Sequence, residues 1–249
     1  MTKRIGIIGG SGLEDPEIIE NPEKVKLATP YGAHSDITIG EIDKKPVAIL
    51  SRHNKKHNLP PTQVNNRANI YALNELKCSK IVASTAVGSL RDVIEPGDIV
   101  FPDQFIDFTR HRETTFFESF LQGEMKHTQM ADPFNEQIRN ELIEKAAELK
   151  ISIHNKATVI TIEGPRFSTR AESHMFRAWG ADLINMSIAP EAILANEMDI
   201  PYAVIAMSTD YDCWKDDSEP VSWEAVLETF NKNVNNVLEL LLAWIKFQA

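Results

Sequence analysis

The sequence has few cysteines and no apolar segment long enough to cross a membrane. Cys78 and Cys213 are the only thiols among 249 residues, and they form no metal-binding or redox motif. Two thiols in a chain of this length are typical of a reducing compartment. The apolar stretch 237–245 is too short for a bilayer and contains Glu239. Glycines interrupt the first apolar run too early for a signal peptide, so we expect a cytoplasmic protein with no membrane partner.

Motifs for cofactors and metals are missing as well. The third glycine of the dinucleotide-binding fingerprint would fall at position 15, which is Asp15, and no G-K-[ST] sequence marks a P-loop. His53 and His57 have the spacing of a zinc site on a helix. However, Asn54 replaces the glutamate of the motif H-E-x-x-H, and no third ligand stands nearby. The sequence therefore predicts no metal and no cofactor.

Charge and composition narrow the choice further. The formal net charge is −10, and an acidic protein is a poor general ligand for nucleic acid. Any phosphate that it binds must therefore be held by a local pocket. The chain has 43% hydrophobic and 25% charged residues, which is ordinary for a globular protein with a large core. No repeat, low-complexity tract or linker divides it, so residues 1–249 are expected to form a single domain.

Short apolar runs alternate with helix-period segments along the chain. Most runs are rich in Ile and Val, as is typical of central strands covered on both faces. The predicted strands are 4–9, 37–42, 46–51, 80–85, 98–102, 157–162, 183–187 and 202–207. The predicted helices are 62–76, 135–149, 169–179, 190–198 and a long final helix capped by Ser222. This order predicts an α/β fold with a mixed central β-sheet flanked by α-helices, and it leaves 108–131 as a long functional loop.

Six predicted strands end in residues that suit a ligand. The endings are 5–13 (I-G-I-I-G-G-S-G-L), 50–57 (L-S-R-H-N-K-K-H), 83–90 (A-S-T-A-V-G-S-L), 162–172 (I-E-G-P-R-F-S-T-R-A-E), 184–191 (I-N-M-S-I-A-P-E) and 207–214 (M-S-T-D-Y-D-C-W). Each ending alone also fits an ordinary role. Arg52 and His53 suit a solvated loop, Phe167 suits the core, and Asp210 and Asp212 suit helix or turn capping. Ligands of open α/β sheets bind beyond the strand ends, so the six together favour a shared pocket.

These stretches, in this order, resemble the 5′-methylthioadenosine phosphorylases of the trimeric purine nucleoside phosphorylase family. The similarity includes P-G-D-I-V (96–100), D-Q-F-I-D (103–107) and W-G-A-D-L-I-N-M-S (179–187), and it extends from about residue 4 to about residue 230. It implies a nucleoside phosphorylase fold and phosphate-dependent cleavage of the N-glycosidic bond of S-methyl-5′-thioadenosine. The products would be adenine and 5-methylthio-α-D-ribose 1-phosphate, for purine and methionine salvage. Inorganic phosphate would be a co-substrate.

The resemblance also implies roles for individual residues. The phosphate would lie among Ser11, Arg52, His53, Thr85, Ala86 and Ser187. The nucleoside would contact Gly88, Phe167, Asn185, Met186, Asp210, Tyr211 and Asp212. In a homotrimer, His127 would reach across to the site of a neighbouring subunit. Specificity would depend on Ser168, Trp223, Val226 and Leu227.

Asp210 is the expected catalytic residue. The glycosidic bond breaks through an oxocarbenium-like transition state, whose positive charge the bound phosphate stabilises. A carboxylic acid at Asp210 can protonate N7 of the departing purine. Ionised Asp210 and Asp212 would accept hydrogen bonds from the 6-amino group of adenine, whereas a 6-oxo group would face them unfavourably. Relatives that prefer 6-oxopurines usually have Asn at the Asp210 position. Those that cleave guanine and hypoxanthine nucleosides have Glu where this chain has Ser168.

The sequence departs from its relatives at three places. Ser187 stands where they more often have threonine, and the hydroxyl is retained. Trp223 replaces a smaller aliphatic residue near the 5′ group of the substrate. The sequence ends at Ala249, whereas eukaryotic relatives have a further tail that reaches a neighbouring subunit. The last two differences leave the preferred 5′ substituent open.

Two other functions compete with this interpretation. A 6-oxopurine nucleoside or methylthioinosine phosphorylase is the nearest alternative, and Asp210 argues against it. A non-catalytic nucleoside-binding module is the second alternative. It would not need the phosphate-binding set that includes Arg52, His53 and Thr85.

Overall fold

The computed structural model describes residues 3–9, 18–216 and 222–248. Its strands are β1 Arg4–Gly9, β2 Glu20–Val25, β3 Asp36–Ile42, β4 Lys45–Ser51, β5 Cys78–Ser89, β6 Ile99–Val100, β7 Gln104–Phe108, β8 Ile153–His154, β9 Thr158–Ile162, β10 Leu183–Asn185 and β11 Tyr202–Tyr211. Its helices are α1 Asn66–Glu75, α2 Glu136–Glu148, α3 Arg170–Ala178, α4 Ile188–Glu197 and α5 Trp223–Phe247, with a short 3-10 helix at Pro61–Gln63.

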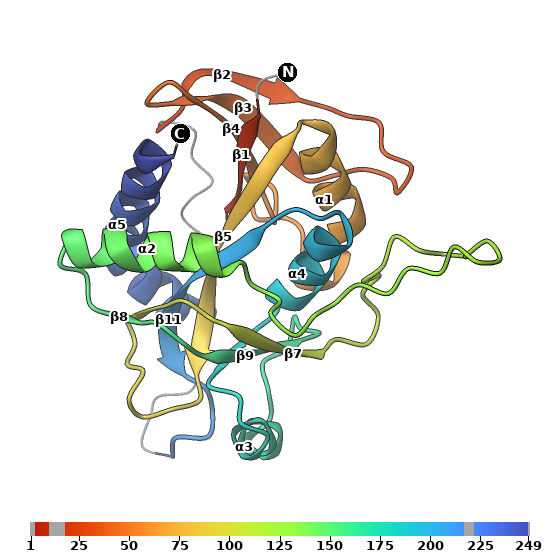
Figure 1. The fold of residues 1–249 in the computed structure, drawn as a ribbon. Helices are drawn as coiled ribbons and strands as arrows, with labels where there is room; N and C mark the ends of the chain where they lie inside the picture. Colours follow the sequence, from red (N-terminus) through yellow and green to blue (C-terminus); the bar gives the residue numbers. More distant parts are fainter. Residues whose placement is uncertain (1–2, 10–17, 217–221, 249) are drawn as a thin grey trace.

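Within the described ranges, these strands form one mixed sheet of eleven strands, which confirms the predicted α/β fold (Figure 1). The main order is β2-β3-β4-β1-β5-β10-β9-β7. Strand β5 is the branch point, because it pairs in parallel with β1 and β11 and, at its end, in antiparallel with β10. The strand is 12 residues long, twice the length of the predicted 80–85. Its carboxyl end therefore lies beside the ends of two other strands.

Helices cover the sheet on both faces, with α1 and α4 on one side and α2 and α5 on the other (Figure 1). Alternate residues of β5 point to the two sides, as a strand requires. Ile81 packs in the layer that contains Leu73 of α1, and Val82 packs in the layer that contains Leu142 of α2. The apolar run at the centre of β5 follows from this double covering.

The predicted starts of α2 and α5 agree with the capping geometry, whereas the helix predicted at 62–76 begins at Asn66. The Asn135 side chain accepts a hydrogen bond from the backbone of Ile138 at 3.0 Å, and Ser222 accepts one from Ala225 at 3.2 Å. Helix α4 starts two residues before the predicted position 190, at Ile188, so that Ser187 becomes its N-cap residue. The cap shift matters because it places a predicted phosphate-binding hydroxyl at a helix N-terminus.

Three strands, β2, β7 and β8, were not predicted. Strand β2, E-N-P-E-K-V, is charged, contains a proline and is largely exposed, and it is held by antiparallel pairing with β3. Strand β8 has only two residues. Strands β2 and β8 have no apolar pattern of their own, because their pairing partners and not their burial determine them, whereas β7 is a short, partly buried run, Q-F-I-D-F.

The predicted long loop 108–131 is confirmed as irregular after Phe108 and projects from the body as an extended arm (residues 109–131; Figure 1). Its base is held by Glu163, whose carboxylate accepts hydrogen bonds from the backbone of Arg110 at 2.7 Å and from Arg112 Nε at 2.8 Å. Near its tip, Leu121 and Met125 are each 71% exposed. The arm therefore has a fixed base, further contacts of Phe116 and Lys126 with Glu197 of α4, and two strongly exposed apolar side chains.

Candidate active site

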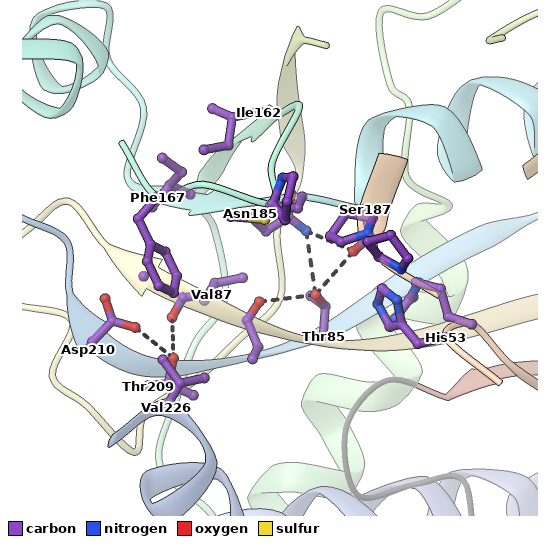
Figure 2. Close-up of a pocket in the computed structure, with 18 of the residues that line it drawn as sticks. His53, Thr85, Val87, Ile162, Phe167, Asn185, Ser187, Thr209, Asp210 and Val226 are labelled. Atoms are coloured by element: carbon purple, nitrogen blue, oxygen red, sulfur yellow. Dashed lines mark hydrogen bonds between the residues drawn. The ribbon is translucent and has the colours of Figure 1, made fainter. Parts of the chain in front are cut away.

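A cavity of about 470 Å³ lies where the ends of β5, β10 and β11 meet the loop after β4, the turn after β9 and the start of α5. Its volume is in the range of pockets that hold small organic molecules. The predicted site residues that line it are Arg52, His53, Thr85, Ala86, Gly88, Phe167, Ser168, Asn185, Met186, Ser187, Asp210, Asp212 and Val226 (Figure 2). Residues from separate stretches of the sequence are thus brought together, as the strand-end argument predicts.

Several predicted residues lie elsewhere. The Tyr211 ring packs edge-on against Trp214, with ring centroids 6.1 Å apart, and Tyr211 does not line the cavity. Leu227 is half-buried on α5 outside the cavity lining. His127 lies on the arm, beside Phe120. Ser11 and the side chain of Trp223 lie outside the described residues.

A buried ion pair holds Arg52 in place at the end of the cavity expected to bind phosphate. Arg52 and Glu191 are each 2% exposed. The guanidinium binds the carboxylate through both Nε and Nη2, and the Nη2–Oε2 distance is 3.0 Å. Glu191 also accepts a hydrogen bond from the Tyr202 hydroxyl at 2.7 Å. The orientation of Arg52 is therefore set by Glu191 and Tyr202, which the sequence analysis did not identify, and by the Ser84 carbonyl, which accepts from Nη1 at 3.1 Å.

A cluster of hydroxyl groups adjoins Arg52. Thr85 Oγ1 and Ser187 Oγ are 3.3 Å apart, and the Asn185 amide nitrogen is 3.3 Å from Ser187 Oγ. Thr161 fixes that amide by donating to Asn185 Oδ1 at 2.8 Å. Ser187 is the N-cap residue of the ten-residue helix α4, whose N-terminus favours negative charge. Donors and helix end together make this part of the cavity suitable for an anion.

His53 adds a neutral imidazole to this end. Its Nδ1 lies 2.8 Å from the Leu59 carbonyl oxygen, so in the neutral ring Nδ1 carries the hydrogen and Nε2 is a hydrogen-bond acceptor. Burial, with a smaller contribution from the neighbouring Arg52, lowers the pKa of His53 to about 4. The ring is therefore uncharged at neutral pH.

The opposite end of the cavity is acidic. Asp212 is 3% exposed and accepts a hydrogen bond from Ser168 Oγ at 2.6 Å. Asp210 Oδ2 is 2.8 Å from the Thr209 hydroxyl. Burial raises the pKa of Asp210 to about 6, with a further increase from the charge of Asp212, although the Thr209 hydrogen bond opposes it. At neutral pH about one site in ten therefore carries a proton on this carboxyl.

Apolar groups line the cavity between these two ends. The Phe167 ring faces the cavity above Asp210 (Figure 2), and it is 41% exposed. Met186 lies against the turn after β9, where Gly164 has a φ of +66° and a Cβ atom would lie 2.4 Å from the Met186 sulfur. Glycine is therefore required at position 164, both for the backbone conformation and for the close approach of Met186.

Some cavity residues were missed by the sequence analysis. His57, Leu59, Pro60 and Pro61 follow Arg52 and His53 and line one wall. Because they follow Arg52 and His53 closely in the sequence, they could have been predicted to lie near the same ligand. Thr209 also lines the cavity, but its position depends on a local irregularity in β11 that no sequence pattern indicated.

The described residues offer neither a metal site nor a membrane-spanning helix. No group of three or more His, Cys, Asp or Glu side chains in ranges 3–9, 18–216 and 222–248 could hold a metal ion. In the same ranges, no helix has both the length and the apolar character that crossing a membrane requires.

Comparison with known proteins identifies the family. A sequence model described as "Phosphorylase superfamily" matches residues 4–246, and the chain belongs to this superfamily. Within it, the chain is 51% identical over 247 residues to S-methyl-5′-thioadenosine phosphorylase of Xenopus tropicalis, covering 97% of this chain and 88% of that protein. It is 49% identical over 242 residues to the enzyme of the same name from Drosophila melanogaster, covering 96% of this chain and 84% of the other.

A solved structure agrees with these sequence relatives. Methylthioadenosine phosphorylase from Schistosoma mansoni in complex with adenine superposes with a TM-score of 0.92 at 40% identity, covering 98% of this chain and 91% of that one. The fold and the superfamily predicted from the sequence are therefore confirmed.

Proposed function

We propose that this chain cleaves S-methyl-5′-thioadenosine with inorganic phosphate, releasing adenine and 5-methylthio-α-D-ribose 1-phosphate. The observation that carries the proposal is a single cavity with two chemically different ends. One end presents Arg52, a hydroxyl cluster and a helix N-terminus, and the other presents two carboxylates. A nucleoside lying between them would have its sugar next to phosphate and its base next to Asp210.

The acidic end supports adenine as the base. Ionised carboxylates only accept hydrogen bonds, and the 6-amino group of adenine donates them. Ser168 contributes only a small hydroxyl, which is already bonded to Asp212. A 6-oxo group would set an acceptor against acceptors, at a cost of about 1 to 3 kcal/mol. This cost disfavours the alternative 6-oxopurine phosphorylase.

The same geometry suggests how the bond breaks. Positive charge develops on the sugar as the purine departs, and a phosphate held by Arg52, Thr85 and Ser187 would stabilise that charge. Asp210 would donate a proton to N7, so that the electron pair of the glycosidic bond leaves with a neutral base. A carboxyl with a pKa of about 6 suits this task better than one of ordinary acidity. The proposed reaction uses phosphate as co-substrate and needs no cofactor or metal.

Structures of relatives support the substrate. The Schistosoma mansoni protein has been solved with adenine. A single-residue mutant of it, described as an adenosine/methylthioadenosine phosphorylase, has been solved with methylthioadenosine. This chain is 39% identical to that mutant, and the match covers 98% of this chain. The intact anion-binding end argues against the second alternative, a non-catalytic nucleoside-binding module.

The proposal includes a cytoplasmic homotrimer. The arm, which projects from the body of the subunit (Figure 1), includes His127 and the exposed Leu121 and Met125. An apolar tip of this kind is suited to a second copy of the chain. The free thiols of Cys78 and Cys213 support a reducing compartment. Light scattering should give about three times the 28.0 kDa mass of the chain; an active monomer would exclude the trimer.

One assay tests the reaction directly. Free adenine should appear from methylthioadenosine only when phosphate is present, and activity should survive EDTA. Methylthioinosine under the same conditions is the matched control for base choice. Adenine release without phosphate would indicate a hydrolase, and absence of any release would leave the binding-module alternative.

A further inference from the structure

Strand β11 departs from regular pairing at Thr209. In its register with β5, Ser208 pairs with Val87 and Asp210 pairs with Gly88, so Thr209 is an extra residue in a β-bulge. Neighbouring side chains of a regular strand point to opposite faces. Here, Thr209 and Asp210 both line the cavity and lie together in Figure 2. The bulge therefore brings a hydroxyl against the carboxyl group that the proposed reaction uses.

The Thr209 hydroxyl lies within reach of two oxygen atoms. Oγ1 is 2.8 Å from Asp210 Oδ2 and 3.3 Å from the carbonyl oxygen of Val87. A hydroxyl has one hydrogen, so it can donate to only one of these oxygens at a time, but its lone pairs allow it to accept as well. Thr209 is 4% exposed, and hydrogen bonds at a buried position are electrostatically stronger than in water.

We propose that Thr209 is a positioning residue that strengthens Asp210 as the acid of the reaction by switching its hydrogen bond between two acceptors. While Asp210 holds its proton on Oδ1, directed to the purine, Thr209 donates to the Val87 carbonyl. When the proton passes to the purine N7, the glycosidic electron pair goes to the purine and Thr209 turns to donate to the carboxylate. The second bond is charge-assisted and stronger, so it favours the state after transfer. This inference rests on the proposed function.

The surroundings of Asp210 make the contribution of Thr209 measurable. Asp212 is the charged neighbour at the same strand end, and its effect and that of burial both raise the pKa of Asp210, whereas the Thr209 bond lowers it. Arg52, His53 and His57 are the other titratable groups among the described lining residues. The lining residues contributed by β5, β10, the turn after β9 and α5 carry no titratable group. Removal of the Thr209 hydroxyl should therefore raise the pKa of Asp210, because burial and the charge of Asp212 would no longer be opposed.

The test is the pH dependence of kcat in Thr209→Val, which keeps the branched shape and removes the hydroxyl. We expect kcat to fall and its alkaline limb to move upward by about one pH unit. Thr209→Ser should restore the wild-type profile, because it retains the hydroxyl. Ser208→Ala is the matched control: it removes the neighbouring buried hydroxyl, which has no partner among the described residues and lies outside the cavity lining. A slower Thr209→Val enzyme with an unshifted profile would reduce Thr209 to a structural role.

A second measurement separates this inference from the proposed function. Carbon-13 NMR of aspartate-labelled protein without ligands can follow Asp210, with its signal assigned by its loss in Asp210→Asn. The titration midpoint should move from about 6 in the wild type to about 7 in Thr209→Val. A midpoint that stays in place in an active enzyme overturns the inference alone. A midpoint that moves in a protein without phosphorolysis overturns the proposed function and retains the hydroxyl–carboxyl coupling.

Discussion

The two ends of the cavity bury charge in opposite ways. At the phosphate end, the guanidinium of Arg52 is matched by Glu191 inside the protein, and His53 is kept neutral. At the purine end, Asp210 and Asp212 lie near each other and receive hydrogen bonds from hydroxyl groups. The first end contains an ion pair whose two charges do not change near neutral pH, and the second contains a carboxyl group whose charge does. This difference supports the proposal that one end holds phosphate and the other transfers a proton.

Arg52→Ala should have the largest effect, at the end of the cavity that contains the Arg52–Glu191 ion pair. The variant removes the fork that would bind phosphate and leaves the buried carboxylate of Glu191 without its cation. We expect the KM for phosphate to rise about a hundredfold or more, with only a few-fold change in the KM for the nucleoside. Steady-state kinetics with each substrate varied in turn measures both. Arg170→Ala, at an exposed ion pair, is the control; equal effects of Arg52→Ala on both constants would contradict the assignment.

Asp210→Asn should change both proton donation and base selectivity at the acidic end of the cavity. An amide is a poor proton donor to N7, but its NH₂ group can meet a 6-oxo oxygen. Turnover of methylthioadenosine should fall, and the selectivity for adenine over hypoxanthine nucleosides should fall by about ten- to hundredfold. The ratio of kcat/KM for the two nucleosides measures this change, with the exposed Asp216→Asn as control. An unchanged ratio would favour a capping role for Asp210.

Gly164→Ala tests the wall between the two ends. The new methyl group would collide with the Met186 sulfur, which lies 2.4 Å from the position of its Cβ atom. We expect kcat/KM for the nucleoside to fall about tenfold while the KM for phosphate changes little, since Met186 is among the residues proposed to contact the nucleoside and not the phosphate. Gly180→Ala is a matched control, because Gly180 also has a positive φ, +90°, but no atom lies within 4 Å of the added Cβ. Similar kinetics in both variants would assign the effect to backbone strain.

Tyr202→Phe should give the smallest effect. It removes the hydrogen bond at 2.7 Å to Glu191 and leaves the ion pair with Arg52. We expect the KM for phosphate to rise about three- to tenfold with kcat nearly unchanged, because one buried hydrogen bond is worth about 1 kcal/mol. Tyr71→Phe, on α1, is the control. A change confined to the KM for the nucleoside would show that Tyr202 does not act through Arg52.

The sequence indicates which residues meet at the cavity better than it indicates what holds them. Arg52, Thr85 and Asp210 could be predicted because each follows an apolar run, and strand ends converge in an α/β sheet. Glu191 and Tyr202 could not, because a carboxylate in a helix and an aromatic residue in a strand look ordinary until the fold joins them. Thr209 depends on a bulge, and bulges follow from pairing between distant strands. Tyr211 was grouped with its neighbours, yet its ring points to Trp214.

The carboxylate of Glu163 has a mechanical consequence. It stands immediately before the turn that carries Phe167, and it also binds the base of the arm through Arg110 and Arg112. Burial opposes the ionised form, but these hydrogen bonds outweigh it and lower the pKa of Glu163. The Glu163 carboxylate thus stays ionised at neutral pH, and its hydrogen bonds to Arg110 and Arg112 weaken only when acid protonates it. One carboxylate thus fastens the base of the arm to the segment that leads into Phe167, while Arg67 and Glu197 fasten the arm further along, so the arm is braced at three separate places.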